Sequence, residues 1–224
     1  DGDTVQIKEN QSPGAEFSIS LVLTNGLHVL KVICLNSGGE GVAASIKTFT
    51  GEDMPQIPTE VTAVAEESGK VTLSWTLPEA GINGGWVNLT KVSYDILRNG
   101  ESLSTDIKET TYIDNLPENE LKSYKYTVIV KFGGEECGSV ESNSVVFGKA
   151  VSLPYEQTFE DASSFDLLNI IDNNGDGVTW QFDTGQFSAG YTFSADNAAD
   201  DYLVLPKMTF KAYNVYQLSF DICS

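Results

Sequence analysis

The chain has 224 residues, of which 41% are hydrophobic, enough apolar side chain to build a core and to exclude a wholly disordered protein. Its 13 basic and 32 acidic residues give a formal net charge of −19. A field of that sign repels nucleic acid and anionic lipid, so we expect neither as a partner. No stretch reaches the roughly 18 apolar residues of a membrane span, so no membrane insertion is expected.

Residues 1–50 are predicted to hold a few strands of a β-sandwich, not a whole one. Apolar residues alternate over Phe17–Leu23, and Asn25-Gly26 is a strong signal for a two-residue hairpin turn. A second alternation runs over His28–Cys34, and a last strand is expected at about Val42–Phe49.

A boundary is predicted next, because residues 51–58 contain two prolines and no periodicity. Short strands follow without any helical period, which favours an all-β sandwich. Glu79–Gly85 is too rich in glycine for a strand and is predicted as a long loop, and Asn99-Gly100 predicts a hairpin turn. The strands are expected at about 60–66, 70–77, 91–99, 102–107, 110–114, 122–132 and 139–147.

The clearest strand pattern lies in Lys122–Val130. Its apolar residues Tyr124, Tyr126, Val128 and Val130 occupy every second position, which places them on one face of a strand. Val71–Trp75 alternates in the same way. We therefore expect two sheets packed face to face through these residues.

A weak internal repeat relates residues 1–50 to the run of strands that follows the linker. The alternating residues of His28–Cys34 match those of Tyr124–Val130 at a constant offset of 96 residues. That distance is about one sandwich domain of ~100 residues, so residues 1–50 are interpreted as the closing strands of a preceding copy.

Several residues stand at particular places in this run of strands. They are Pro58 at its start, Trp75 in the second strand, Tyr94–Gly100 in the third, and Leu116-Pro117 ahead of Tyr124. This set of residues resembles a fibronectin type III domain. The resemblance covers about 57–148, with a partial copy at 1–50, and implies an all-β fold of tandem immunoglobulin-like (fibronectin type III) sandwiches. The glycine-rich loop is similar to versions in surface proteins of host-associated bacteria.

Catalysis has little support in the sequence, and we expect no enzyme. His28 is the only histidine and is expected to be structural, so no Ser-His-Asp arrangement can form around another base. Cys34, Cys137 and Cys223 lack metal-ligand spacing, and their odd number leaves at least one thiol unpaired within the chain. Cys34 lies in an apolar run and is expected to be buried. The chain begins at Asp1, which we interpret as a mature or excised segment.

The most informative run for chemistry is Asp172–Trp180, in the acidic last third of the chain. Side-chain oxygens alternate at Asp172, Asn174 and Asp176, and the glycine that follows allows a sharp turn. Together with the Val178 carbonyl they can converge on one hard cation, and Ca²⁺ needs six to eight oxygens at ~2.3–2.6 Å. The run therefore predicts a calcium site.

Three interpretations of this run stay open. An EF-hand or dockerin loop, in which Asp183 takes the twelfth place, needs flanking helices that the sequence does not predict. A turn cluster without metal is the second, because Asp, Asn and Gly are common turn residues. The third is a calcium loop inside a β-sandwich.

Four further runs occur in order in the last third of the chain: Phe159-Glu160, Asp172–Trp180, Asp200–Pro206 and Leu218–Phe220. With these runs, residues of about 151–224 resemble the start of the cleaved-adhesin (gingipain-adhesin-like) family of jelly-roll modules. The resemblance implies a calcium-stabilised sandwich with Asp172, Asn174 and Asp176 as ligands, and Glu160 and Asp201 as ligands or supporting acids at the same or another site. Tyr202 stands where the family usually has Trp.

These observations predict a non-catalytic adhesion or spacer segment, extracellular or on a bacterial cell surface, that binds a host or extracellular protein or glycan. One alternative is the ancillary region of a secreted peptidase. Another is a carbohydrate-binding module that stacks sugar on Trp86, Trp180 or Tyr202. The expected organisation is a partial fibronectin type III-like unit at 1–50, a linker at 51–58, a complete unit at 59–148, and the N-terminal part of a jelly roll at 149–224.

Overall fold

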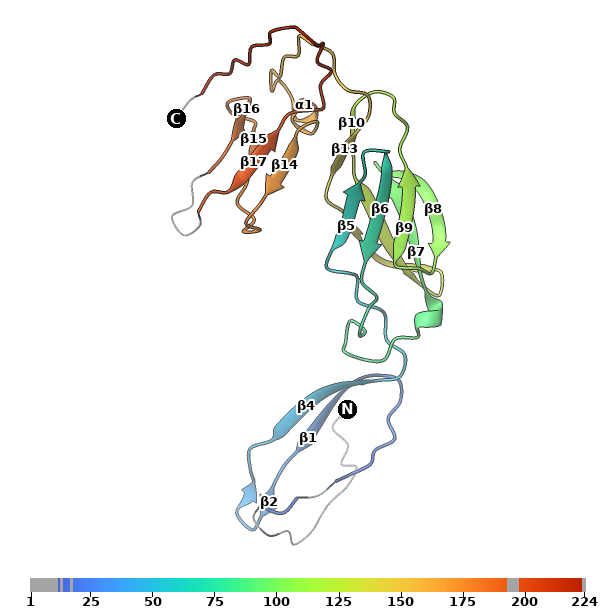
Figure 1. Cartoon of the computed structure of the whole chain (residues 1–224). Coiled ribbons are helices and arrows are strands. Elements are labelled where there is room, and N and C mark those ends of the chain that lie inside the picture. Colours follow the sequence, from blue (N-terminus) through green and yellow to red (C-terminus); the bar gives the residue numbers. More distant parts are fainter. Residues whose placement is uncertain (1–11, 13, 17, 193–197, 223–224) are drawn as a thin grey trace.

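The computed structural model describes residues 12, 14–16, 18–192 and 198–222. Within these residues the fold is all-β, apart from one short α-helix, α1 (Ala162–Phe165), and one 3-10 turn, η1 (Leu89–Lys91). Three parts follow one another along the chain: an N-terminal hairpin, a two-sheet sandwich, and a C-terminal part of short ladders (Figure 1). No helix in the described part of the chain is long and apolar enough to span a membrane.

The N-terminal hairpin pairs β1 (Gly26–Val32) with β4 (Ala44–Thr50), with the small ladder β2 (Leu35–Asn36) and β3 (Gly39–Glu40) between them. The predicted strand over Phe17–Leu23 and its turn at Asn25-Gly26 are wrong. Phe17 lies outside the described residues, residues 18–24 form no strand, and Gly26 begins β1. Alternation shows which side chains can share a face, but a strand also needs a partner, and β1 takes β4 as its partner.

This hairpin has the same pairing register as a hairpin of the sandwich. Val32 pairs with Ala44 in β1 and β4, and Val128 pairs with Val140 in the later hairpin. Both members of the pair are thus displaced by the repeat offset of 96 residues.

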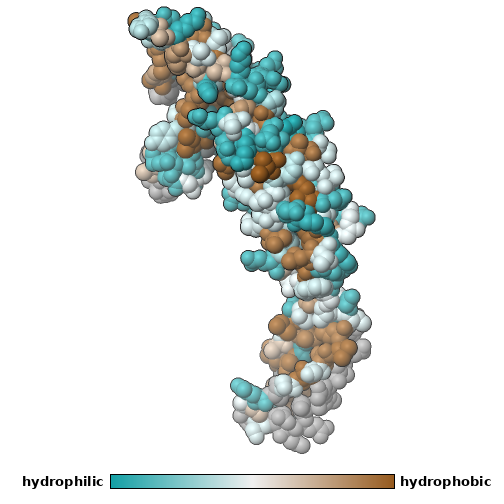
Figure 2. Space-filling model, turned by 45° about the vertical axis from the view of Figure 1, so that its right-hand side comes forward, coloured by the Kyte–Doolittle hydropathy of each residue, from teal (hydrophilic) through white to brown (hydrophobic). Residues whose placement is uncertain are grey.

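Much of the apolar surface in Figure 2 lies over the N-terminal hairpin, at the lower end of the view. Exposed residues of this hairpin and the loops beside it include Leu27, Val29, Val32, Leu35 and Ile46.

The sandwich consists of a three-stranded sheet in the order β5-β6-β9 and a four-stranded sheet in the order β12-β11-β7-β8, both antiparallel. A small ladder of β10 with β13 completes it. These strands are β5 (Val61–Ala65), β6 (Lys70–Trp75), β7 (Val92–Arg98), β8 (Glu101–Ile107), β9 (Thr111–Asn115), β10 (Lys122–Tyr124), β11 (Tyr126–Phe132), β12 (Glu135–Glu141) and β13 (Val145–Phe147).

One hydrophobic core lies between the two sheets, and the alternation in the sequence predicts its main residues. Trp75 packs edge-on against Tyr94 with ring centroids 5.2 Å apart, a favourable geometry for two aromatic rings. The predicted face-to-face packing is confirmed, because both alternating sets are buried. The first set is Val71, Leu73 and Trp75 of β6, and the second is Tyr124 of β10 with Tyr126, Val128 and Val130 of β11.

The predicted strand at 122–132 is split at Lys125. The Lys125 N–H donates to Asn99 Oδ1 at 2.7 Å, and the Asn99 N–H donates to the Lys125 carbonyl at 2.8 Å. Lys125 therefore leaves the ladder to hold the Asn99-Gly100 turn, and the strand changes partner from β13 to β12 at this point. The predicted strand at 139–147 is split as well, and its first part begins earlier, at Glu135.

The predicted turn at Asn99-Gly100 is confirmed. Both residues have positive φ, 50° and 83°, and they connect β7 directly to β8. A turn with two left-handed residues matches the twist of two adjacent strands, and Asn-Gly is a residue pair that adopts this turn readily.

The C-terminal part contains β14 (Asn169–Asp172), β15 (Gln181–Asp183), β16 (Ser188–Gly190) and β17 (Asp201–Val204). β14 pairs with β17 and β15 with β16, as two separate antiparallel ladders. Among the described residues these ladders do not close into a sandwich. A cleaved-adhesin-like jelly roll in this region stays a prediction.

Candidate functional site

The acidic run lies in the turn that leaves β14, and Asp172 organises that turn. Its carboxylate accepts the N–H groups of Gly175 (2.7 Å), Asp176 (3.2 Å) and Gly177 (2.8 Å). Both glycines have positive φ, 69° and 78°, so the chain can fold around the carboxylate. The side chain of Asp172, the first residue of the bend, therefore holds the bend in shape, as in an Asx turn.

Asp176 and Asn174 hold the second half of the turn. Asp176 Oδ1 accepts the Val178 N–H at 2.7 Å. Asn174 Nδ2 donates to Asp176 Oδ2 at 3.0 Å and to the Ala198 carbonyl at 2.7 Å. The Asn174 amide thus ties the turn to the segment that enters β17.

Asp201 joins the turn through strand pairing, because it lies opposite Asp172 in the β14–β17 ladder. One oxygen, Oδ2, accepts the Tyr191 hydroxyl at 3.0 Å, while the buried Oδ1 has no hydrogen-bond partner among the described residues. Burial raises the pKa of Tyr191, and the hydrogen bond to Asp201 and the charges of Asp201, Asp176 and Asp172 raise it further. Three carboxylates therefore raise the pKa of one tyrosine hydroxyl and keep it protonated.

The structure brings most of the predicted calcium ligands together. Asp172, Asn174, Asp176 and Val178 belong to one turn, and Asp201 borders it. Glu160 is exposed ahead of α1 and makes no hydrogen bond to the turn among the described residues. The EF-hand and dockerin interpretation is wrong, because strands β14 and β15 flank the run where that interpretation needs helices.

Two observations test how well the residues suit a cation. In this arrangement the described residues contain no group of three or more His, Cys, Asp or Glu side chains placed to hold a metal. The buried Asp201 Oδ1 nevertheless lacks a partner, and an unpaired buried carboxylate oxygen is costly unless a donor or cation satisfies it. The oxygen donors are of the chemistry that Ca²⁺ prefers.

Sequence reasoning missed the residues that support the turn. Tyr191 donates to Asp201, and Asn173 Nδ2 donates to Asp200 Oδ2 at 2.6 Å. The signal for Asn173 is indirect: β14 ends in an acid and β17 begins with one, and only their pairing register shows that these two positions meet. Tyr191 gave no signal, because its approach depends on the path of β16.

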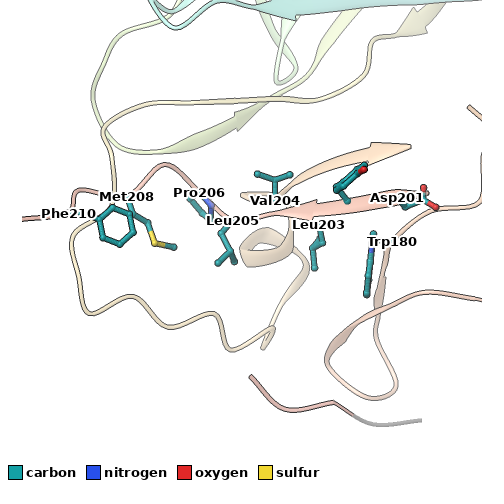
Figure 3. Close-up of a pocket in the computed structure, with 9 residues that line it drawn as sticks. Trp180, Asp201, Leu203, Val204, Leu205, Pro206, Met208 and Phe210 are labelled. Carbon is teal, nitrogen blue, oxygen red and sulfur yellow. The ribbon is translucent and has the colours of Figure 1, made fainter. Parts of the chain in front are cut away.

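An open apolar groove of about 630 Å³ runs beside this site along β17. In Figure 3 Trp180 stands at one end beneath Asp201, Leu203 and Leu205 follow, and Met208 and Phe210 close the other end. The Trp180 ring lies 5.6 Å from that of Tyr191, so it belongs to a small aromatic cluster.

The three aromatic residues proposed as a sugar platform lie in different settings. Trp86 is 65% exposed and Tyr202 is 52% exposed, whereas Trp180 is half-buried against Tyr191. Trp86 lies between the glycine-rich loop and η1 of the sandwich, and the other two residues lie in the C-terminal part. They do not form one platform.

The remaining candidates for chemistry are structural or solvent-facing. His28 is half-buried and its Nε2–H donates to the Thr24 carbonyl at 2.7 Å. The expectation of a buried thiol at Cys34 is wrong: Cys34 is exposed, as are the apolar residues Val32 and Ile33 ahead of it, because the described residues of this hairpin have no core of their own to bury them. Cys34 and Cys137 are both free, and Cys223 lies outside the described residues.

No protein-family model matches the sequence, and no curated protein matches it. Among solved structures, the chain is similar to domains d3–d4 of the rat CD45 extracellular region, with 11% identity and a TM-score of 0.34 over 64% of this chain and 76% of that chain. It is also similar to the chicken CNTN1 FN1–FN3 domains, with 16% identity and a TM-score of 0.29 over 57% of this chain and 46% of that chain. The fold assignment therefore rests on the strand order and the core of this chain itself.

Proposed function

We propose that this chain is a non-catalytic adhesion or spacer segment of an extracellular or surface protein. The observation that carries the proposal is the sandwich of residues 61–147, whose two antiparallel sheets pack face to face over one core. The strongly acidic composition suits a solvated extracellular module. The partner class is an extracellular protein or glycan.

Calcium stabilisation of the C-terminal part belongs to the same proposal. Asp172, Asn174, Asp176 and Asp201 would hold the ion with the Val178 carbonyl, and water would complete the shell. Support comes from the unpaired Asp201 Oδ1 and from the three carboxylates that raise the pKa of Tyr191. The ion would offset that concentration of negative charge.

Calorimetric titration of the 224-residue chain with calcium tests the site. We expect saturable binding that is lost in Asp176→Ala and kept in the control Glu156→Gln, which changes an exposed acid outside the turn. Because the ion binds only the folded form, calcium at 100 times its Kd should add about 2.7 kcal/mol to the stability of the C-terminal part. Unchanged heat in Asp176→Ala, or no heat in the wild type, would reject the calcium site and leave the spacer role untouched.

The exposure of Trp86 favours a second candidate function, glycan binding. An aromatic ring that is 65% exposed offers a flat apolar face on which a sugar ring can stack. A glycan array followed by titration of the best hit should then give saturable binding that falls at least about tenfold in Trp86→Ala, because the ring supplies most of the contact area. Tyr202→Ala, in the C-terminal part, is the matched control. Equal binding by wild type and Trp86→Ala would rule this function out.

A further inference from the structure

The segment 51–58, which the sequence predicts as a linker, contains a buried carboxylate. Asp53 is only 2% exposed, and its two oxygens accept four N–H groups. Such burial is costly for a charge unless it is fully hydrogen-bonded. The donors are the Met54 N–H (2.9 Å), the Asn83 N–H (2.8 Å), the Asn83 side-chain amide (3.0 Å) and the Gly85 N–H (3.0 Å).

These hydrogen bonds keep Asp53 ionised. Burial alone would raise its pKa, but the bonds from Asn83, Gly85 and Met54 outweigh burial, and the pKa lies below its usual value. Three of the four donors belong to the glycine-rich loop of the sandwich, so the charge is satisfied only while the segment stays against that loop.

The backbone of the segment is bonded to the same loop. The Asp53 N–H donates to the Trp86 carbonyl at 2.8 Å, and the Ile82 N–H donates to the Met54 carbonyl at 2.9 Å. Pro55 and Pro58 are buried as well. Beside these bonds, Lys91 of η1 pairs with Glu52 at 2.6 Å.

The loop has the shape that this contact requires. A Cβ added to Gly81 would lie 2.2 Å from Asp53 Oδ2, and one added to Gly85 would lie 2.5 Å from the Phe49 ring of β4. Only glycine leaves room for Asp53 on one side and for the N-terminal hairpin on the other. The glycine-rich loop therefore packs closely against both Asp53 and the N-terminal hairpin.

We propose that residues 51–58 form an ordered joint between the N-terminal hairpin and the sandwich. The hydrogen bonds of Asp53 to the 79–86 loop hold this joint, and with it the hairpin, in a fixed position. The two prolines and the absence of periodicity predict a linker at 51–58, and in the structure this linker is an ordered connection. The proposal concerns the geometry of the chain and is independent of what the chain adheres to.

Amide hydrogen exchange on the full chain tests the joint. In Asp53→Ala we expect exchange at least about tenfold faster in the peptides that cover 52–57 and 81–86, with the strands β6 and β11 unchanged, because only the local opening becomes easier. Glu60→Gln is the matched control, since it neutralises an exposed acid just beyond the segment.

Swapping the carboxylate and the amide between positions 53 and 83 gives a second, independent test, again measured by amide hydrogen exchange. Asn83→Asp places a carboxylate beside Asp53 and should open the joint, whereas the double variant Asp53→Asn with Asn83→Asp restores one amide–carboxylate pair and should recover part of the protection. Exchange within about twofold of wild type in both single variants would overturn the joint. Faster exchange in β6 and β11 as well would also overturn it, because Asp53 would then be a general stabiliser of the sandwich.

Discussion

At the scale of single residues, a polar network around Asp114 lies inside the sandwich. Asp114 is 7% exposed, and its Oδ2 accepts both Arg98 Nη1 and the Tyr126 hydroxyl at 2.8 Å. Burial raises the pKa of Tyr126, and the hydrogen bond and charge of Asp114 raise it further, so the hydroxyl remains a donor. The buried carboxylate is tolerated because two donors satisfy it.

Tyr126→Phe removes one of these donors and leaves the ring volume almost unchanged. We expect a loss of about 1.5–3 kcal/mol in unfolding free energy, the usual value for a hydrogen bond to a charged group. Urea unfolding measures it. Tyr112→Phe is the control, because Tyr112 packs at the edge of the same core and its hydroxyl has no part in this network, and it should change stability by less than about 0.5 kcal/mol. Equal effects of the two substitutions would mean that the network contributes little.

At the scale of elements, local chemistry decides how much of the fold can be predicted. The Asn99-Gly100 turn and the alternation of Tyr124–Val130 are local signals, and both are confirmed. The break at Lys125 depends on Asn99, which is distant in sequence, so no local pattern shows it. The strand predicted at Phe17–Leu23 fails for the same reason, since alternation cannot supply a pairing partner.

The candidate site shows the same division. The Asp172–Asp176 spacing predicts a tight acidic turn, and the structure has one. Asp201 borders the turn because strand register places it opposite Asp172. The cleaved-adhesin resemblance leaves open whether Asp201 and Glu160 belong to this site or to another, and their role as calcium ligands stays a prediction. The role of Asp53 could not be predicted, because a single acid between two turn-like segments gives no sign of burial.

At the scale of the whole molecule, the core of the sandwich is self-contained. Its buried residues all come from Val61 to Val145, and none comes from the N-terminal hairpin or from the ladders that follow. The connections at its two ends add no residue to this cluster, although Pro55 and Pro58 are buried beside the sandwich. Asp53 bonds to the glycine-rich loop at one end, and the Lys149 N–H donates to the Asn119 carbonyl at 2.8 Å at the other. The sandwich should therefore fold without its neighbours.

An excised fragment of residues 51–149 tests this independence. We expect one cooperative urea transition with a slope of about 1 kcal/mol per M, as for a single small domain, and a midpoint within about 0.3 M of the sandwich transition in the full chain. Near-UV circular dichroism from the Trp75–Tyr94 pair follows the core directly. A fragment that begins at residue 59 lacks the joint and should keep the same cooperative transition while losing protection in the 81–86 loop. A fragment 51–149 that fails to unfold cooperatively would show that the neighbouring parts complete the core, against the burial pattern that separates them.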